Sequence, residues 1–168
     1  RIPDRGPADA EGVGQIPFRE DLLAGFEFPA ENEFSQLLED LVAFFQPKRL
    51  AGRRVLVTAG PTFEPIDPVR GITNLSSGKM GFALARAARE AGAKVTLVAG
   101  PSALPTPRGV RRIDVLTARE MFDAVMGYAN RAEVFIAVAA VADWRVANAS
   151  AQKLKKDAHA TPPSLQFE

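Results

Sequence analysis

A hydroxyl-rich loop, Ser76–Gly81, carries the residue types that most clearly indicate chemistry. It reads Ser-Ser-Gly-Lys-Met-Gly, follows an apolar run and a stretch of turn-forming residues, and opens an alanine-rich helical pattern. Backbone N–H groups, hydroxyls and a lysine at a helix N-terminus are typical of an anion site, most often for phosphate. The loop is not a Walker A motif, because Met80 follows Lys79, and only Gly78 and Gly81 fit a GxGxxG fingerprint. The alternative is a serine-capped helix with glycines for close packing.

Several polar residues precede this loop. Arg70 offers a fork for a carboxylate or phosphate, and Asn74, four residues later, offers an amide that can orient a carbonyl. Taken alone, both residues are more often loop scaffolding. Gly60 follows the first expected strand, at the edge where open parallel sheets bind ligands, or it belongs to a plain turn. Glu64 and Asp67 could hold a metal through water, although loop carboxylates are more often solvated or cap turns.

A second group of candidates lies toward the C-terminus. The apolar run Val134–Val141 ends in small residues that would let a ligand approach the backbone. Asp143 follows, and it either accepts a hydrogen bond from a sugar hydroxyl or base amine, or caps the next turn. The basic run Lys153–Lys156 is suited to neutralising a triphosphate, or is a solvated surface stretch. His159, the single histidine, is expected to be exposed and to have no role.

The elements that must position these residues follow from hydrophobic periodicity. Strands are expected over 54–58, 94–98, 110–116 and 134–141, and helices over 79–91 and after a capping box at Thr117–Glu120. This order predicts an α/β, Rossmann-like three-layer fold with a mainly parallel sheet. The run 134–141 is typical of a central parallel strand. Upstream, an apolar stripe from Phe34 to Phe45 predicts a helix that ends before Pro47.

Composition narrows the class of protein. The chain has 168 residues, 46% of them hydrophobic, and a net charge of +1. This balance suggests neither a nucleic-acid surface nor a membrane surface. There is no cysteine, which excludes disulfides, thiolate metal sites and a cysteine nucleophile, and fits a cytoplasmic location. The first residue is not Met, so we expect the chain to be a piece of a longer protein.

Taken in order, AGPTFEPIDPVRGITNLSSGKMG, TLVAGPSALPTP, AAVADWR and QKLKK resemble the bacterial phosphopantothenoylcysteine synthetases. These form the ligase half of the bifunctional coenzyme A biosynthesis proteins. The resemblance covers residues 52–157 and implies that residues 52–168 are the N-terminal part of a nucleotide-binding ligase domain, C-terminally incomplete. Residues 1–16 resemble the tail of the fused decarboxylase domain, although Phe18 and Arg19 depart from its usual pattern. Residues 17–51 would be a linker with one helix.

The resemblance also implies a reaction and its partners. The carboxylate of 4′-phosphopantothenate would attack the α-phosphate of CTP, and cysteine would then displace CMP from the acyl-cytidylate. Mg²⁺ would arrive with CTP, held by phosphate oxygens without a protein metal site, and FMN would belong to the decarboxylase domain alone. The ligase domain would form a homodimer. The present stretch alone is expected to be inactive.

The resemblance assigns roles residue by residue. Gly60, Ser77, Gly78 and Lys79 would face the nucleotide phosphates, and Ala137, Val138, Ala139 and Asp143 would line the cytidine site. Lys153 would steady the triphosphate, Asn74 would hold the acyl-nucleotide, and Arg70 would support the pantothenate side. The alternative is another Rossmann-like nucleotide-binding protein, such as a dinucleotide-dependent reductase. A reductase needs an acid at the end of the second strand, which instead reads Val98-Ala99-Gly100.

Overall fold

A computed structural model describes residues 31–155 and 164–168 of the chain. The chain divides into two units, Arg1–Leu38 and Glu39–Glu168. The helix predicted from the apolar stripe is present as α1, Glu31–Phe45, which crosses the boundary between the units. Within the described part, no helix is both long enough and apolar enough to span a bilayer. All the features below lie in the second unit.

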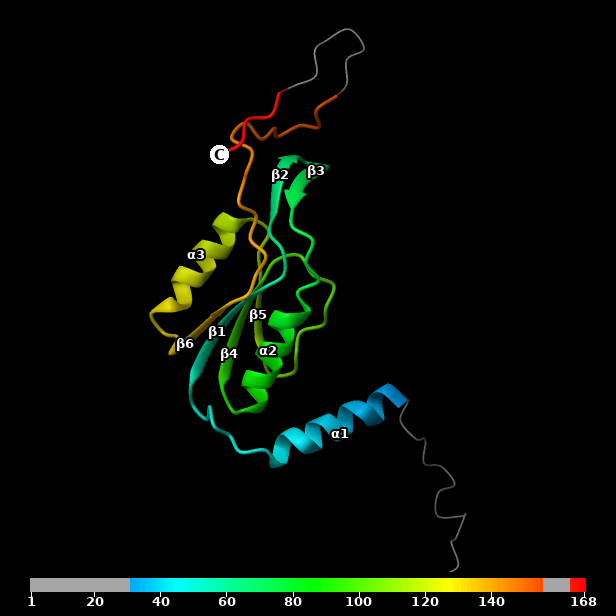
Figure 1. Cartoon of the computed structure of the whole chain (residues 1–168), viewed down its shortest axis with the longest axis vertical. Helices are drawn as coiled ribbons and strands as arrows, with labels where there is room; N and C mark the ends of the chain where they lie inside the picture. The colour runs from blue at the N-terminus through cyan, green and yellow to red at the C-terminus, as the bar shows by residue number, and fades with distance from the viewer. Residues whose placement is uncertain (1–30, 156–163) are drawn as a thin grey trace, which may run out of the picture. The chain divides into compact units, whose positions relative to one another are not determined.

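A parallel four-stranded sheet forms the centre of this unit (Figure 1). Its strands are β1 (Arg54–Ala59), β4 (Lys94–Ala99), β5 (Arg111–Asp114) and β6 (Val134–Ala137). They are arranged in the order β5-β4-β1-β6, and every neighbouring pair is parallel. The innermost strands, β1 and β4, are almost wholly buried because their apolar runs face helices on both sides. The predicted α/β, mainly parallel fold is therefore confirmed.

One helix covers each face of the sheet. On one face, Phe82, Ala85 and Ala88 of α2 (Lys79–Glu90) pack against alternate residues of β1 and β4. On the other face, Met121 of α3 (Ala118–Ala129) packs against Leu56 and Val98. The many alanines of α2 let the helix approach the sheet closely. These layers position the N-termini of both helices at the carboxyl edge of the sheet, as in other open parallel sheets.

The helix signals in the sequence were accurate. Gly92 has φ +95 and directly follows Ala91, the C-terminal cap of α2, at the position where helices often end on a left-handed glycine. Thr117 caps α3, and its hydroxyl accepts a hydrogen bond from the Glu120 N–H at 3.1 Å. The Glu120 carboxylate accepts in return from the Leu116 N–H at 2.6 Å, one residue before the position of an ideal capping box.

The stretch after β1, expected to be a long loop, instead forms an antiparallel hairpin. Strand β2 (Phe63–Asp67) pairs with β3 (Arg70–Thr73), with an irregular register between Pro65 and Asp67. Figure 1 shows this hairpin projecting beyond the carboxyl edge of the sheet. The two prolines in and beside β2 hide the usual alternation of a strand, which explains why the pattern was taken for a loop.

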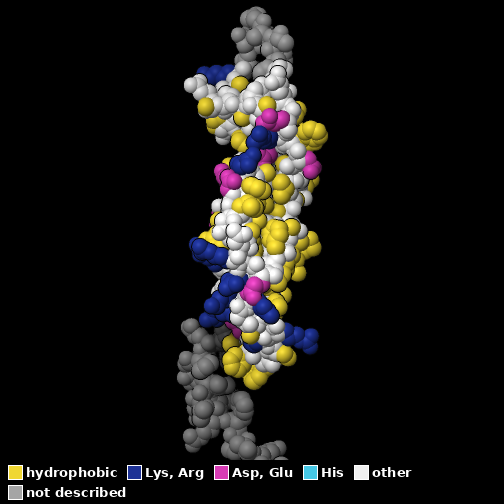
Figure 2. Space-filling model, turned by 90° about the vertical axis from the view of Figure 1, so that its left-hand side faces the viewer, with side chains coloured by type: hydrophobic (Ala, Val, Ile, Leu, Met, Phe, Trp, Pro, Cys, Tyr) yellow, Lys and Arg dark blue, Asp and Glu magenta, His cyan; other side chains and the backbone are white. Residues whose placement is uncertain are grey.

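Strand β6 also differs from its prediction. The run 134–141 was expected to be a central strand, but β6 ends at Ala137 and pairs only with β1, at the edge of the described sheet. Among the exposed hydrophobic residues are Phe122 and Met126 of α3 and Val134 and Phe135 of β6. Figure 2, seen from the side of α3 and β6, shows hydrophobic side chains gathered along the middle of this face.

Candidate functional site

The Ser76–Gly81 loop lies directly on the carboxyl end of the central strand. A Cβ on Gly78 would stand 3.3 Å from the Gly60 backbone, and a Cβ on Gly81 only 2.4 Å from the Ala59 Cβ. Gly60 and Gly78 both have positive φ, +75 and +73, which side chains disfavour. Glycine therefore lets the first turn of α2 touch the ends of β1 and, through Val138, of β6.

The loop presents the donors that an anion requires. Gly78 caps α2 without a side-chain hydrogen bond, and the first helical turn carries no acid. The Ser76 hydroxyl accepts from the Gly78 N–H at 3.3 Å, and the Ser77 hydroxyl accepts from the Lys79 N–H at 3.4 Å. Both contacts are long, so the N–H groups keep donor capacity, and the Lys79 side chain is exposed. The positive end of the helix dipole adds to this preference for negative charge.

Asn74 connects the loop with the segment that follows β6. Its Nδ2 donates to the Val141 carbonyl at 2.9 Å. Next to it, the Thr73 hydroxyl donates to the Thr62 carbonyl at 2.7 Å, and the Thr62 hydroxyl accepts from the Ala142 N–H at 2.9 Å. The Asn74 side chain is exposed and its amide oxygen accepts from no described residue. Asn74 is thus held by its own donor, and its acceptor faces solvent beside the loop.

The end of β6 is anchored beside β1. The Thr58 hydroxyl accepts from both the Val138 and Ala139 N–H groups at 3.3 Å. Beyond them, the Ala140 N–H donates to the Gly60 carbonyl at 2.8 Å. Ala137 and Asp143 are exposed at either end of this short segment, while Val138 and Ala139 are partly buried in the core. Of these residues, Val138 lies beside Gly81 of the loop, whereas Ala139 packs against the core cluster on the other face of the sheet.

A buried carboxylate, Asp67, holds the turn of the hairpin together. Its side chain is fully buried and accepts from the Val69 and Arg70 N–H groups at 2.9 Å each. Arg70 closes a fork on the same carboxylate, with Nε at 3.0 Å and Nη2 at 2.5 Å. The hydrogen bonds from Arg70, and then those from the backbone, hold the pKa of Asp67 well below its ordinary value. Asp67 therefore stays ionised.

The same pair clamps the segment that carries Lys153. The Leu154 N–H donates to Asp67 Oδ2 at 3.1 Å, and Arg70 Nη2 donates to the Leu154 carbonyl at 2.8 Å. The Ser150 N–H adds a bond to the Ile66 carbonyl at 2.8 Å. We call this set of contacts the Asp67–Arg70–Leu154 clamp. Sequence reasoning treated Asp67 as a water-mediated metal ligand or a turn cap, and it missed this contact to a distant segment.

The clamp separates two residues that were expected to act on one nucleotide. Lys153 is exposed and lies beside Leu154, at the turn of the hairpin. The anion loop begins after Thr73, at the opposite end of the hairpin. Within one chain, the structure therefore does not bring Lys153 alongside Lys79. Lys156 and His159 lie outside the described residues.

Asp143 lies in a different cleft, of about 350 Å³, between α3 and the 142–145 segment. Glu64, Arg119, Phe122 and Trp144 are among its other lining residues, whereas the anion loop and Lys153 are not. The Glu64 carboxylate is buried and accepts from the Ala118 N–H at 2.7 Å, at the start of α3. Asp143 is thus placed beside α3 and not next to Lys79.

Acidic side chains near the hairpin were considered as metal ligands from the sequence. Among residues 31–155 and 164–168, no group of three or more His, Cys, Asp or Glu residues could hold a metal ion. Glu64 and Asp67 are both engaged in the hydrogen bonds described above.

Comparison with known proteins finds a family model and curated relatives that point to the same family. The family model described as "DNA/pantothenate metabolism flavoprotein C-terminal domain" matches residues 50–168. The "Coenzyme A biosynthesis bifunctional protein CoaBC" of Vibrio vulnificus is 60% identical over 121 residues, covering 72% of this chain and 30% of that protein. The protein of the same name from Mycobacterium bovis is 50% identical over 157 residues, covering 93% of this chain and 35% of that protein. The chain thus spans about a third of the length of these relatives.

Solved structures agree with the sequence relatives. The crystal structure of the C-terminal domain of "Coenzyme A biosynthesis bifunctional protein CoaBC" superposes with a TM-score of 0.61 at 42% identity, covering 72% of this chain and 55% of that one. The DNA/pantothenate metabolism flavoprotein from Streptococcus pneumoniae superposes with a TM-score of 0.54 at 30% identity, covering 56% of this chain and 42% of that one.

Proposed function

The chain belongs to the family of the DNA/pantothenate metabolism flavoprotein C-terminal domain, and on that basis we propose that it is part of a cytoplasmic, CTP-dependent phosphopantothenate–cysteine ligase. One observation carries this proposal. The hydroxyl-rich N-terminus of α2, Asn74 and the small-residue end of β6 meet at the carboxyl edge of the sheet. That edge is where parallel sheets bind nucleotides.

Two displacement steps make up the proposed reaction. The carboxylate of 4′-phosphopantothenate attacks the α-phosphorus of CTP, the bond to pyrophosphate breaks, and an acyl-cytidylate forms. The amine of cysteine then attacks the acyl carbon, CMP leaves with the bonding electrons, and the amine loses a proton to solvent. Neither step needs a protein nucleophile, so positioning and charge neutralisation supply the catalysis.

We assign each candidate residue a part in binding the substrates or in neutralising charge. Gly60, Ser77, Gly78 and Lys79 receive the phosphates, and the exposed amide of Asn74 orients the acyl-nucleotide. Ala137, Val138 and Ala139 border the base and ribose, and Asp143, in the cleft beside α3, contacts the end of the nucleotide farthest from the anion loop. Lys153 neutralises charge as pyrophosphate departs, and Mg²⁺ arrives with CTP. Arg70, assigned to the pantothenate side, also acts as a positioning residue, because two of its nitrogens hold Asp67 and Leu154. FMN belongs to the decarboxylase part of the longer protein.

A direct assay tests the function. The complete protein that contains this chain, supplied with CTP, Mg²⁺, 4′-phosphopantothenate and cysteine, should form 4′-phosphopantothenoylcysteine, detected by mass spectrometry. Replacing CTP with ATP should slow the reaction. A folded protein that forms no product with either nucleotide would rule out the ligase assignment.

Asn74→Ala in the complete enzyme should leave the fold intact and lower kcat by about 100-fold, the scale of one donor lost from a reacting centre. The donor in question is the second N–H of the Asn74 amide, since the first is bound to the Val141 carbonyl. The acyl-cytidylate should be handled poorly, while CTP affinity should change little. Single-turnover kinetics and CTP titration separate the two effects. Asn130→Ala, at the exposed end of α3, is the matched control. Near-normal turnover of Asn74→Ala at saturating cysteine would return Asn74 to a scaffolding role.

Lys153→Gln should slow acyl-cytidylate formation by about tenfold or more, because one positive charge no longer offsets the charge on the departing pyrophosphate. Pyrophosphate release in a single turnover measures this step. Lys155→Gln, two residues along the same exposed segment, provides the comparison. Equal rates for wild type and Lys153→Gln would show that the basic run is only a solvated surface.

We also propose that the ligase is a homodimer through this domain. The support is the position of Lys153 at the turn of the hairpin, away from the anion loop of its own chain. A second copy could bring Lys153 to that loop. Mixing the Asn74→Ala and Lys153→Gln proteins would then rebuild one intact site in each mixed dimer and restore about a quarter of the activity. No recovery after subunit exchange would place both residues in a single chain.

A further inference from the structure

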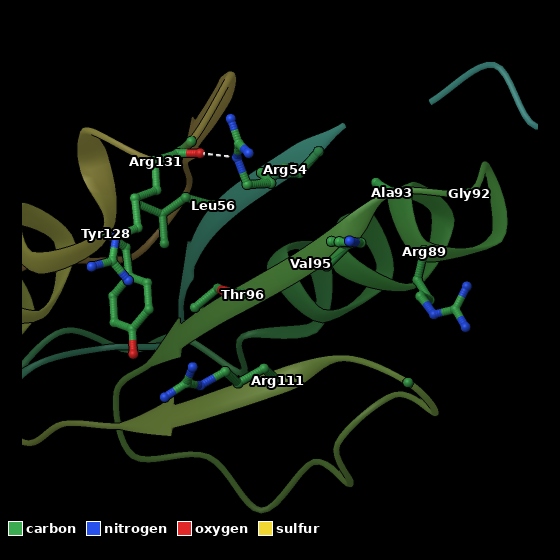
Figure 3. Close-up of a pocket in the computed structure, with 14 residues that line it drawn as sticks. Arg54, Leu56, Arg89, Gly92, Ala93, Val95, Thr96, Arg111, Tyr128 and Arg131 are labelled. Atoms are coloured by element: carbon green, nitrogen blue, oxygen red, sulfur yellow. Dashed lines mark hydrogen bonds between the residues drawn. The ribbon is translucent and has the colours of Figure 1, made fainter. Parts of the chain in front are cut away.

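A second cleft, larger than the one at Asp143, lies at the amino edge of the sheet (Figure 3). It measures about 620 Å³ and is lined by the first residues of β1, β4 and β5 and by the C-terminal ends of α2 and α3. The anion loop, Asn74 and Lys153 do not line it. In a parallel sheet the amino and carboxyl edges face opposite ways, so this cleft is separate from the proposed ligase site.

The lining of this amino-edge cleft is strongly basic. It contains five basic residues and no acid: Arg54, Arg89, Lys94, Arg111 and Arg131. Arg54 has an ion-pair contact with Glu133 at 3.7 Å, outside the lining. In the part of the chain that the structure describes, the other four have no ion-pair partner. Four of the five cations that line the cleft are therefore not neutralised by an acid of the described residues.

Fold stability accounts for only some of these charges. Arg89 is in the last turn of α2 and Arg131 follows α3, where a cation complements the helix dipole. Arg54 also contributes to the fold, because its Nε donates to the Arg131 carbonyl (Figure 3). Lys94 and Arg111 lie on strands and have no such role. Arg54 and Lys94 are partners in the parallel β1–β4 register, so two positive charges lie on neighbouring strands and repel each other. An anionic ligand would relieve that repulsion.

The cleft also has an organised apolar and hydroxyl lining. The Arg111 guanidinium lies over the Tyr128 ring, 5.2 Å from its centroid, and Figure 3 shows the two side chains facing each other. This stacking fixes the arginine fork in place. Ala132 and the Tyr128 ring, both partly buried, supply apolar surface. The Tyr128 and Thr96 hydroxyls line the same space, and neither bonds to any described residue.

We propose that the amino-edge cleft binds an organic phosphate monoester, with the phosphate among Arg54, Lys94 and Arg111 and an apolar or aromatic body against Tyr128 and Ala132. A phosphate dianion matches the several unpaired cations, and the arginine forks can bind it through two oxygens. The apolar lining selects against a bare inorganic ion. This site is independent of the proposed ligase reaction.

Methyl-resolved NMR of the full 168-residue chain, titrated with phenyl phosphate, tests the site. The methyl signals of Thr96 and Ala132 should shift in a saturable way, and Val138, at the anion loop, reports any binding at the other edge. Phenol and inorganic phosphate should each bind at least about fivefold more weakly than phenyl phosphate. Phenol lacks the phosphate group, and inorganic phosphate lacks the aromatic ring. Added salt should weaken binding, as expected of exposed charges.

Arg111→Gln should weaken the binding of phenyl phosphate at least about fivefold, equivalent to about 1 kcal/mol. Arg119→Gln is the matched control, because Arg119 also stacks on a ring of α3, that of Phe122 at 5.9 Å, but lies outside the cleft. If Arg111→Gln does not fold, Lys94→Gln takes its place. Shifts confined to Val138, unchanged affinity in the folded variant, or equal binding of phenol would each overturn the proposal.

Discussion

The Asp67→Asn substitution is expected to release the segment that carries Lys153 from the turn of the hairpin. The asparagine keeps the shape of the side chain but loses the charge that Arg70 and the Leu154 N–H bind. Hydrogen exchange of the Leu154 and Ser150 amides should accelerate by at least about tenfold, because the clamp opens more often. In the complete enzyme, acyl-cytidylate formation should slow as it does in Lys153→Gln.

A surface pair provides the matched control for this substitution. Asp114 binds Arg112 at 2.6 Å, but its side chain is 70% exposed, against 0% for Asp67. Exposed ion pairs contribute little to stability, so Asp114→Asn should leave the Leu154 and Ser150 amides unchanged. Equal exchange rates in wild type and Asp67→Asn would show that the clamp does not depend on the charge of Asp67.

The clamp should also be visible in the pH dependence of stability. The pKa of Asp67 is lowered from an ordinary value of 3.8, so the ionised carboxylate stabilises the native state above that value, and the contribution is lost as the pH falls toward the lowered pKa. Between about pH 5 and about pH 3, wild type should therefore lose more unfolding free energy than Asp67→Asn. The lowered pKa of Glu133 affects both proteins alike. Denaturant unfolding at several pH values measures the difference.

Gly81→Ala should be the most damaging conservative change at the anion loop. The new Cβ would stand 2.4 Å from the Ala59 Cβ and 3.1 Å from the Ala59 Cα and from a methyl carbon of Val138. The first turn of α2 must then move off the sheet. We expect a loss of about 2 kcal/mol in the free energy of unfolding, typical of overpacking in a close-packed core. The N–H groups of the loop would move with the helix, so CTP affinity in the complete enzyme should fall as well.

Gly127→Ala tests this prediction with the same chemical change. Gly127 lies within α3, and a Cβ there would meet nothing within 4 Å. Because alanine is the better helix former, this variant should gain about 0.5–1 kcal/mol. The two substitutions are thus expected to have opposite signs. If Gly81→Ala also proved stabilising, the close contact between α2 and β1 would be refuted.

The sequence predicted those parts of the fold that depend on local patterns. Strands β1 and β4 and helices α2 and α3 lie where their apolar periodicity and caps place them, within a residue or two. The β2–β3 hairpin was missed because Pro65 and Pro68 interrupt its alternation. Strand β6 was taken for a central strand because a continuous apolar run shows burial on two faces but not the number of neighbouring strands.

For the candidate site, too, the parts that depend on local sequence were predictable and the contacts between distant segments were not. The loop on α2 and its closeness to the end of β1 followed from glycine spacing and helix-start chemistry. The clamp did not, because Leu154 and Asp67 are 87 residues apart in sequence and no local pattern connects them. The placement of Asp143 beside α3, and of Lys153 at the hairpin turn, likewise depends on the path of the chain after β6.

The clamp has a consequence for the order in which this unit folds. It joins segments 84 to 87 residues apart, so closing it carries the entropy cost of a long loop. Its hydrogen bonds can offset that cost only after the chain has collapsed and brought the two segments together. The hairpin turn, by contrast, is made of contacts two and three residues apart and can form early. Lys153 would therefore reach its place in the last stage of folding, and the same segment would be among the first to open in native-state fluctuations.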